Sequence, residues 1–183
     1  MNQEISGVVG LDLSLTSTGI ARITDKHVSY AVIPTTPKMS LGERWEKIIW
    51  GIRARIDVRD VIFIEDYAWG KAKKNESNVV TLAEISGLVK YIMWKLVKRM
   101  PIPVNPSVVK KWATGNHQAH KDDIKLGCYK KYGIEFKTSD EADAYAIADF
   151  GWHVCRKLLG DRRELSKWEE DMLARFTKYS SSS

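Results

Sequence analysis

Apolar residues in the first part of the chain fall into short runs that are separated by turn residues. Residues 5–14 form a mostly apolar run that becomes polar towards its end, and residues 18–24 and 27–33 are two further β-prone runs. Asp25 and Lys26, between the last two runs, are typical of a tight turn. The pattern predicts three strands joined as an antiparallel meander.

The apolar spacing then changes from that of strands to that of a helix. Ser40 and Glu43 form a capping box, after which apolar residues recur on one face of a helix predicted over about residues 41–57. The apolar run 61–64 is too short for a helix and ends at Glu65. It predicts a buried strand.

Residues 79–97 carry apolar side chains on more than one face of a predicted helix. Such a helix needs two partners, so we expect it to pack on the sheet and also against a second copy of the chain. Residues 102–105 predict a last short strand, and Pro106 suits the first turn of the next helix. Thr138 and Glu141 form a capping box that opens a late helix. The alternation of strands and helices predicts an α/β domain with a mixed sheet.

The 183 residues are enough for one domain with a core of its own. We assign residues 1–160 to this domain and residues 161–183 to a C-terminal extension, in which 180–183 are a frayed serine end. Four apolar positions mark a weakly amphipathic helix in the extension: Leu165, Trp168, Met172 and Phe176.

The charge balance of 29 Lys and Arg against 23 Asp and Glu gives a net charge of +6, which suits a polyanionic partner but does not by itself indicate nucleic acid. No apolar run approaches the roughly 20 residues of a membrane span, and we expect no secretory signal. Two cysteines, Cys128 and Cys155, fit a reducing compartment. We expect a cytoplasmic protein.

Acidic residues interrupt apolar segments at three separate places. Asp12 lies inside the first predicted strand, Glu65 ends the fourth, and Asp140 and Asp143 lie one turn apart at the start of the late helix. Taken singly, each acid also fits an ordinary surface or helix-dipole role. If the four converge, their repulsion of about 4 kcal/mol per pair requires divalent cations. Carboxylates suit Mg²⁺ or Mn²⁺, and two such ions serve phosphodiester hydrolysis.

Four segments within residues 6–150 are informative as a set. Three of them contain the acids, and the fourth is basic: residues 10–21, 62–65, 140–148, and 106–115 leading to 119–121. In this order they resemble the motifs of RuvC-type Holliday-junction resolvases. A bacterial and a phage-encoded protein both fit the resemblance, with the cytoplasm of a bacterial cell or of a phage-infected host as the location.

The resemblance implies an RNase H-like fold, in which the antiparallel meander and the parallel strands form one mixed sheet flanked by helices. It also implies a homodimer, formed through the helix of about 79–97, and a metal-dependent nuclease that nicks two symmetry-related strands of a four-way DNA junction. By motif match, Asp12, Glu65, Asp140 and Asp143 would hold two Mg²⁺ or Mn²⁺ ions, and Lys121 would lie near the scissile phosphate.

Basic residues lie on both sides of the acidic segments, which suits a phosphate backbone brought to a metal centre. The candidate DNA contacts are Lys71, Lys73, Lys74, Lys110, Lys111 and Trp112. Under the resemblance, Tyr67 and Trp69 are candidates for an aromatic wedge at the junction centre. The lysines also fit ordinary solvated helix faces. A zinc site is not predicted from His117, His120 and Cys128, because no second ligand pair or short cysteine spacing accompanies them.

Two other functions are compatible with parts of the sequence. Residues 12–19, an acid followed by a hydroxyl-rich turn, also resemble the phosphate loop of an actin-like ATPase or sugar kinase, but 183 residues hold only one of the two halves such enzymes need. A branched-DNA binding protein without catalysis is the second alternative. Four carboxylates facing phosphates argue against a pure DNA-binding role.

Overall fold

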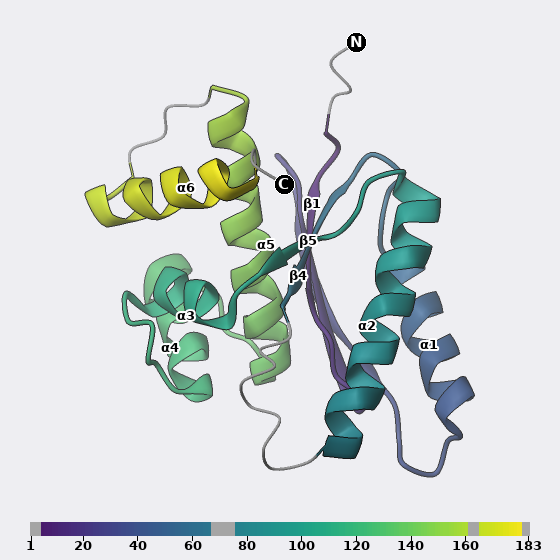
Figure 1. Ribbon diagram of the computed structural model, residues 1–183. Helices are drawn as coiled ribbons and strands as arrows, with labels where there is room; N and C mark the ends of the chain where they lie inside the picture. Colours follow the sequence, from purple (N-terminus) through teal and green to yellow (C-terminus); the bar gives the residue numbers. More distant parts are fainter. Residues whose placement is uncertain (1–4, 67–75, 161–164, 181–183) are drawn as a thin grey trace.

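Five strands form one mixed sheet at the centre of the molecule (Figure 1). The computed structural model describes residues 5–66, 76–160 and 165–180. The strands are β1 (Val8–Asp12), β2 (Ser17–Ile23), β3 (Val28–Pro34), β4 (Val61–Glu65) and β5 (Ile102–Val104). Their order is β3-β2-β1-β4-β5; β2 pairs antiparallel with β1 and β3, and β4 pairs parallel with β1 and β5. The predicted meander and mixed sheet are confirmed.

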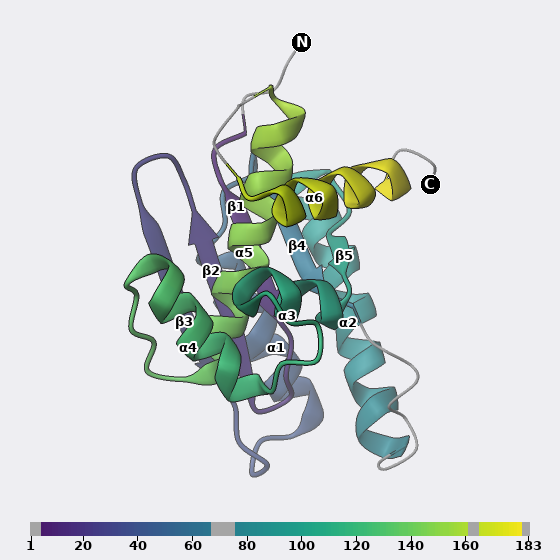
Figure 2. The same ribbon diagram turned by 90° about the vertical axis from the view of Figure 1, so that its left-hand side faces the viewer.

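Helices cover both faces of the sheet (Figures 1 and 2). One face carries α1 (Leu41–Arg53) and α2 (Glu76–Val97). The other carries α5 (Ser139–Leu158), with α3 (Pro106–Thr114), α4 (Lys121–Tyr132) and α6 (Lys167–Ser180) outside it. Within the described ranges, none of these helices combines the length and apolar character that a membrane crossing needs.

Both predicted capping boxes are present. The Glu43 amide donates to the Ser40 hydroxyl over 3.3 Å, and the Ser40 amide donates to the Glu43 carboxylate over 2.7 Å. Helix α1 is nevertheless shorter than the predicted 41–57. It ends at Arg53, and the amide of the next residue, Ala54, donates to the carbonyls of Trp50 and Ile52. In the turn that follows, the Asp57 amide donates to the carboxylate of Asp60 over 2.7 Å.

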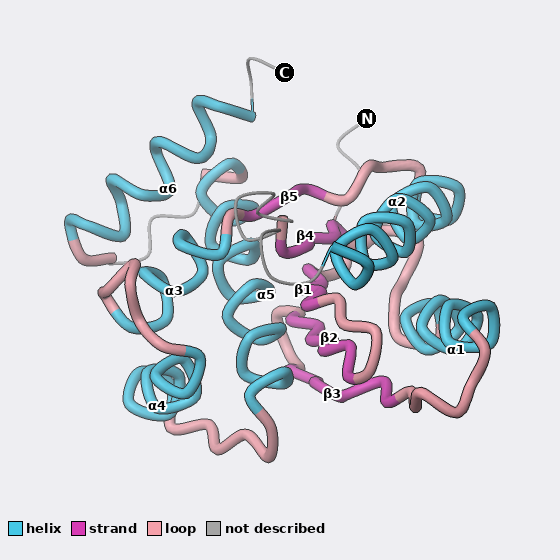
Figure 3. Tube along the Cα trace, turned by 60° about the horizontal axis from the view of Figure 1, so that its bottom comes forward, coloured by secondary structure: helices cyan, strands magenta, loops and turns pink. Residues whose placement is uncertain are grey.

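Side chains alternate between the two faces of the sheet, which divides the core into two layers. The helices that cover these layers, α1 and α2 for one and α5 for the other, lie on opposite sides of the strands (Figure 3). Val9 and Leu11 of β1 belong to the layer under α1 and α2. Val8 of β1 and Phe63 of β4 belong to the layer under α5. Asp12, the residue after Leu11, therefore lies on the α5 side.

Helix α5 lies unusually close to β1 and β2 because glycines face it. A Cβ atom on Gly10 would overlap the carbonyl oxygen of Ala144, and one on Gly19 would overlap the carbonyl oxygen of Asp140. Gly19 pairs with Asp12 across the two strands. The close approach thus brings the first turn of α5 to the end of β1.

The C-terminal extension packs against the main body through one face of α6. Leu173 is fully buried, and the Phe176 ring lies 4.9 Å from that of Phe150 and 6.3 Å from that of Phe63, between centroids. Glu169 forms an ion pair of 2.6 Å with Lys131 of α4. Helix α6 therefore adds a third layer outside α5; residues 161–164 and 181–183 of the predicted extension lie outside the described residues.

The close contact between α5 and β2 can be tested with Gly19→Ala. We expect this change to lower the free energy of unfolding by about 1–3 kcal/mol, because the new methyl group has to push α5 off the sheet. The matched control is Gly42→Ala in α1, where a Cβ meets nothing within 4 Å. Alanine is favoured over glycine in a helix by about 0.5–1 kcal/mol, so this variant should not be destabilised. Urea unfolding of both variants measures the difference, and equal stabilities would contradict the packing described here.

Candidate metal centre

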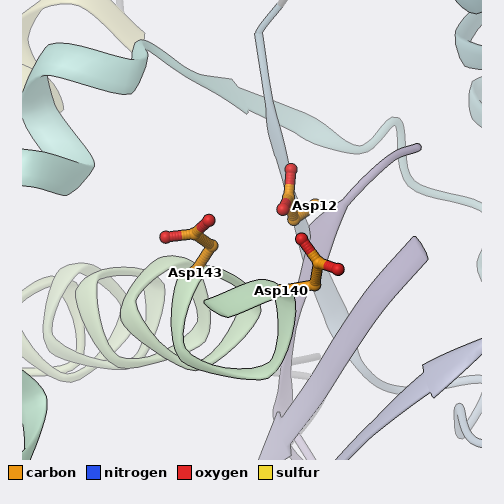
Figure 4. Close-up of side chains that lie close together, drawn as sticks. All are labelled: Asp12, Asp140 and Asp143. Carbon is orange, nitrogen blue, oxygen red and sulfur yellow. The ribbon is translucent and has the colours of Figure 1, made fainter. Parts of the chain in front are cut away.

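Three aspartates from the two ends of the chain meet at the carboxyl end of β1 (Figure 4). Asp12 is the last residue of β1, and Asp140 and Asp143 lie in the first turns of α5. One carboxylate oxygen from each residue can be chosen so that all three lie within 4.8 Å of one another. Asp12 and Asp143 are each only 8% exposed, and Asp140 is half-buried. The predicted convergence of these three acids is observed.

The chemistry of this group fits a hard divalent cation. Two oxygens that bind one Mg²⁺ at about 2.1 Å lie roughly 3–4 Å apart, so small side-chain rotations would bring the three carboxylates onto one ion. Three mostly buried like charges at such distances repel by about 4 kcal/mol per pair at an effective dielectric of 20, which a bound cation would offset. Oxygen-only ligation suits Mg²⁺ or Mn²⁺ better than zinc, which binds largely through nitrogen and sulfur.

The turn between β1 and β2 holds one of the carboxylates in place. The hydroxyl of Ser17 donates a short hydrogen bond to the carboxylate of Asp140. The hydroxyl of Thr18 donates to the carbonyl of Ser14 over 2.7 Å, and the Ser14 amide donates back to it over 3.2 Å. These hydroxyls thus stabilise the turn and hold the carboxylate of Asp140.

A second set of contacts fixes this turn from the other side of the sheet. The carbonyl oxygen of Leu15 accepts hydrogen bonds from the hydroxyl of Thr35 and from the guanidinium of Arg44, whose Nε lies 3.0 Å away. The Thr35 amide donates to the carbonyl of Thr16 over 2.9 Å. Helix α1 and the end of β3 thus support the loop that follows Asp12.

Glu65, the fourth predicted ligand, ends the strand next to Asp12. The parallel register pairs Leu11 with Ile64, so Asp12 and Glu65 follow at the same level. Because Phe63 faces α5 and side chains alternate, Glu65 points to the same face of the sheet as Asp12. Its half-buried carboxylate does not belong to the group that gathers within 4.8 Å. Its metal-binding role stays a prediction.

The structure describes the side chains of some of the candidate DNA-binding residues and not of others. Lys110 and Lys111 lie on α3 and are half-buried. The DNA contact predicted for Trp112 does not agree with its position, because its side chain is 1% exposed and has no surface to offer a base. Lys121 begins α4, but its side chain lies outside the described part of the chain. Five other candidates lie entirely outside the described residues: Tyr67, Trp69, Lys71, Lys73 and Lys74.

The burial of Trp112 is explained by an aspartate that the sequence analysis missed. Asp149 of α5 is 5% exposed, and its carboxylate accepts a 2.7 Å hydrogen bond from the Trp112 indole and a short one from the Tyr132 hydroxyl. Burial and the charge of Asp149 raise the pKa of Tyr132, which keeps this donor protonated. Asp149 therefore ties α3 and α4 to the helix that carries Asp140 and Asp143. An acid within the apolar stretch 144–150 was the signal available in the sequence.

Both cysteines are buried thiols. Burial raises the pKa of Cys128 to about 12, with a smaller contribution from the charges of Asp149 and Asp143. Burial also raises the pKa of Cys155 to about 11. Among the described residues, the group that could hold a metal consists of Asp12, Asp140 and Asp143 and does not include His117, His120 or Cys128.

Comparison with solved structures identifies the fold. This chain is similar to Thermus thermophilus RuvC in complex with a Holliday junction substrate, with a TM-score of 0.59 and 19% identity over 81% of this chain and 94% of that chain. A second structure of T. thermophilus RuvC matches with a TM-score of 0.56 and 19% identity, over 87% of this chain and 99% of that one. No family model and no curated protein matches the sequence.

The protein therefore has an RNase H-like α/β fold, as predicted. More particularly, it has the arrangement of sheet and helices seen in RuvC, over nearly the whole length of the RuvC chains.

The state of the two thiols gives a direct test of the core around the site. At pH 8 we expect Cys128 and Cys155 to resist iodoacetamide in the native protein, because the reactive thiolate is scarce and its access is blocked. In urea both thiols should react at the rate of a free cysteine. Mass spectrometry counts the modified residues, and rapid labelling of Cys128 before unfolding would contradict the packing of α4 on α5.

Proposed function

We propose that the protein is a metal-dependent endonuclease that resolves four-way DNA junctions by paired nicks. The observation that carries this proposal is the gathering of Asp12, Asp140 and Asp143 at the carboxyl end of the central strand. The shared fold with RuvC, one structure of which contains a Holliday junction substrate, supports it by analogy. The order and spacing of the acidic segments point the same way.

In this proposal the three aspartates, with Glu65 as a fourth ligand, hold two Mg²⁺ or Mn²⁺ ions. Bound divalent ions would activate a water and stabilise the leaving oxygen of the phosphodiester. The protein's own part is to hold the carboxylates in place, which the Ser17 hydrogen bond does for Asp140. Lys121, at the start of α4, would offset the negative charge that develops on the phosphate.

The proposed DNA surface includes Lys110 and Lys111 of α3, together with Lys71, Lys73 and Lys74. Their role would be to neutralise phosphates, which positions the strand without reading its sequence. Tyr67 or Trp69 would supply the aromatic wedge at the junction centre. These assignments rest on the resemblance of the sequence to the resolvase motifs and on the basic residues that flank them.

The metal-centre proposal is tested by cleavage of a synthetic four-way junction. With Mg²⁺ we expect paired nicks, and with a chelator none. Asp12→Asn should reduce cleavage by about 100-fold or more. Loss of a residue that only orients a metal ligand typically costs about 10–100-fold in activity, and loss of the ligand itself should cost at least as much. Binding of the junction should be kept. Glu65→Gln should show a comparable loss if the fourth acid binds metal.

The matched control is Asp25→Asn, which removes a carboxylate from the β2–β3 turn at the opposite end of the sheet. It should cleave like the wild type. Unchanged cleavage by Asp12→Asn would remove this residue from the mechanism. Binding of the junction by the wild-type protein without cleavage in Mg²⁺ or Mn²⁺ would indicate the non-catalytic alternative.

We also propose that two copies associate through the outer face of α2, so that two centres act on one junction. Tyr91 and Trp94 on this face are 54% and 42% exposed. A groove of about 450 Å³ lies beside them between α1 and α2, and it is lined by apolar side chains that include Trp45 and Leu88. An apolar face of this kind is typical of an interface.

Sedimentation equilibrium at micromolar concentration tests the dimer. The wild type should have twice the 20.9 kDa mass of the chain, and Trp94→Glu should be monomeric because it places a charge in the apolar face. Lys47→Glu is the control, since Lys47 is exposed on α1 and does not line the groove. A monomeric wild type would contradict coupled nicking by a dimer.

A further inference from the structure

The C-terminal helix forms a groove with the basic helix α3. In Figure 2, α6 lies next to α3 on the outer side of α5. The groove between them has a volume of about 350 Å³. Its polar lining includes Lys111 and His117 from the α3 side and Asp171 and Arg175 from α6; its apolar lining includes Trp168.

The charges of this groove are not balanced. Within the described residues, no acidic side chain forms an ion pair with Lys111 or Arg175, and Asp171 is the single acid among the lining residues. The neighbouring Lys131 is different, because it pairs with Glu169 at 2.6 Å and its ammonium lies 4.3 Å from the centre of the Trp112 ring. The positive charges that remain available to a partner are therefore those of Lys111 and Arg175.

The groove lies within reach of nucleic acid held at the metal centre. Asp143 and Phe150 are seven residues apart on α5, which corresponds to about 10 Å along the helix axis. Phe176, the neighbour of Arg175, packs directly on Phe150. The helices that form the groove, α3 and α6, lie on the same side of the sheet as α5, which carries Asp140 and Asp143 (Figure 1). Double-stranded DNA carries about one charge per 1.7 Å of its axis, so an arm leaving the metal centre presents several phosphates over this distance.

We propose that the groove between α3 and α6 binds the phosphate backbone of nucleic acid, as a contact additional to the metal centre. This inference rests on the proposed function, since it assigns a further part of the same substrate to a second surface. Arg175 would bind a phosphate through two hydrogen bonds from its planar guanidinium, and Lys111 would act as a point charge beside it. The C-terminal extension would then be a DNA-binding element and not only a packing layer.

The test is the affinity for a labelled four-way junction without divalent metal, measured by fluorescence anisotropy over a range of salt concentrations. One phosphate contact changes the binding constant about eightfold for each tenfold change in salt. We therefore expect Arg175→Glu to weaken binding at least about eightfold at about 0.1 M salt and to lower the log–log salt slope by about 0.9. Arg175→Gln should give the slope change with a smaller loss of affinity, and Arg175→Lys should keep the slope.

The control Lys47→Glu makes the same change of charge on α1, on the opposite face of the sheet, and should bind like the wild type. If the wild type binds and cleaves the junction but Arg175→Glu keeps its affinity and salt slope, the groove proposal is wrong and the proposed function stands. If the wild type binds no junction, both are wrong. An equal loss in the Lys47→Glu control would mean that net charge, and not this groove, determines the affinity.

Discussion

The candidate metal centre depends on the close contact between α5 and the two strands beneath it. Gly10 and Gly19 leave no side chain between the sheet and the helix, so the α5 backbone rests on β1 and β2. The hydrogen bond from the Glu141 amide to the Thr138 hydroxyl, at 3.2 Å, defines where the helix begins. Together these two features place Asp140 and Asp143 beside Asp12. Core packing thus holds the three carboxylates close together against their mutual repulsion.

Local sequence rules predicted most of the elements and the three acids that meet. Capping boxes identified the starts of α1 and α5, and short apolar runs identified the strands. Asp12 was recognisable because an acid within a buried strand needs compensation. The end of α1 was predicted too late, because the apolar helical spacing continues to Ile56 although the helix ends at Arg53.

The role of Trp112 could not be predicted from its neighbours in the sequence. Beside Lys110 and Lys111 it resembled a DNA-binding residue, yet the side chain points inwards to Asp149, 37 residues further along. A buried indole N–H usually has a hydrogen-bond partner, and the partner of Trp112 is visible only once α3 packs on α5. The same limit applies to α6, whose partners Phe63 and Phe150 belong to distant elements.

A continuous set of contacts connects the extension to the basic helix. Glu169 of α6 neutralises Lys131 of α4, and Lys131 lies over the ring of Trp112. Trp112 belongs to α3 and is held by Asp149 of α5. Helix α6 therefore supports the position of α3 through α4, in addition to lying beside it. Because these contacts use Lys131 and Glu169 and not Lys111 or Arg175, this support does not require a phosphate in the groove between α3 and α6.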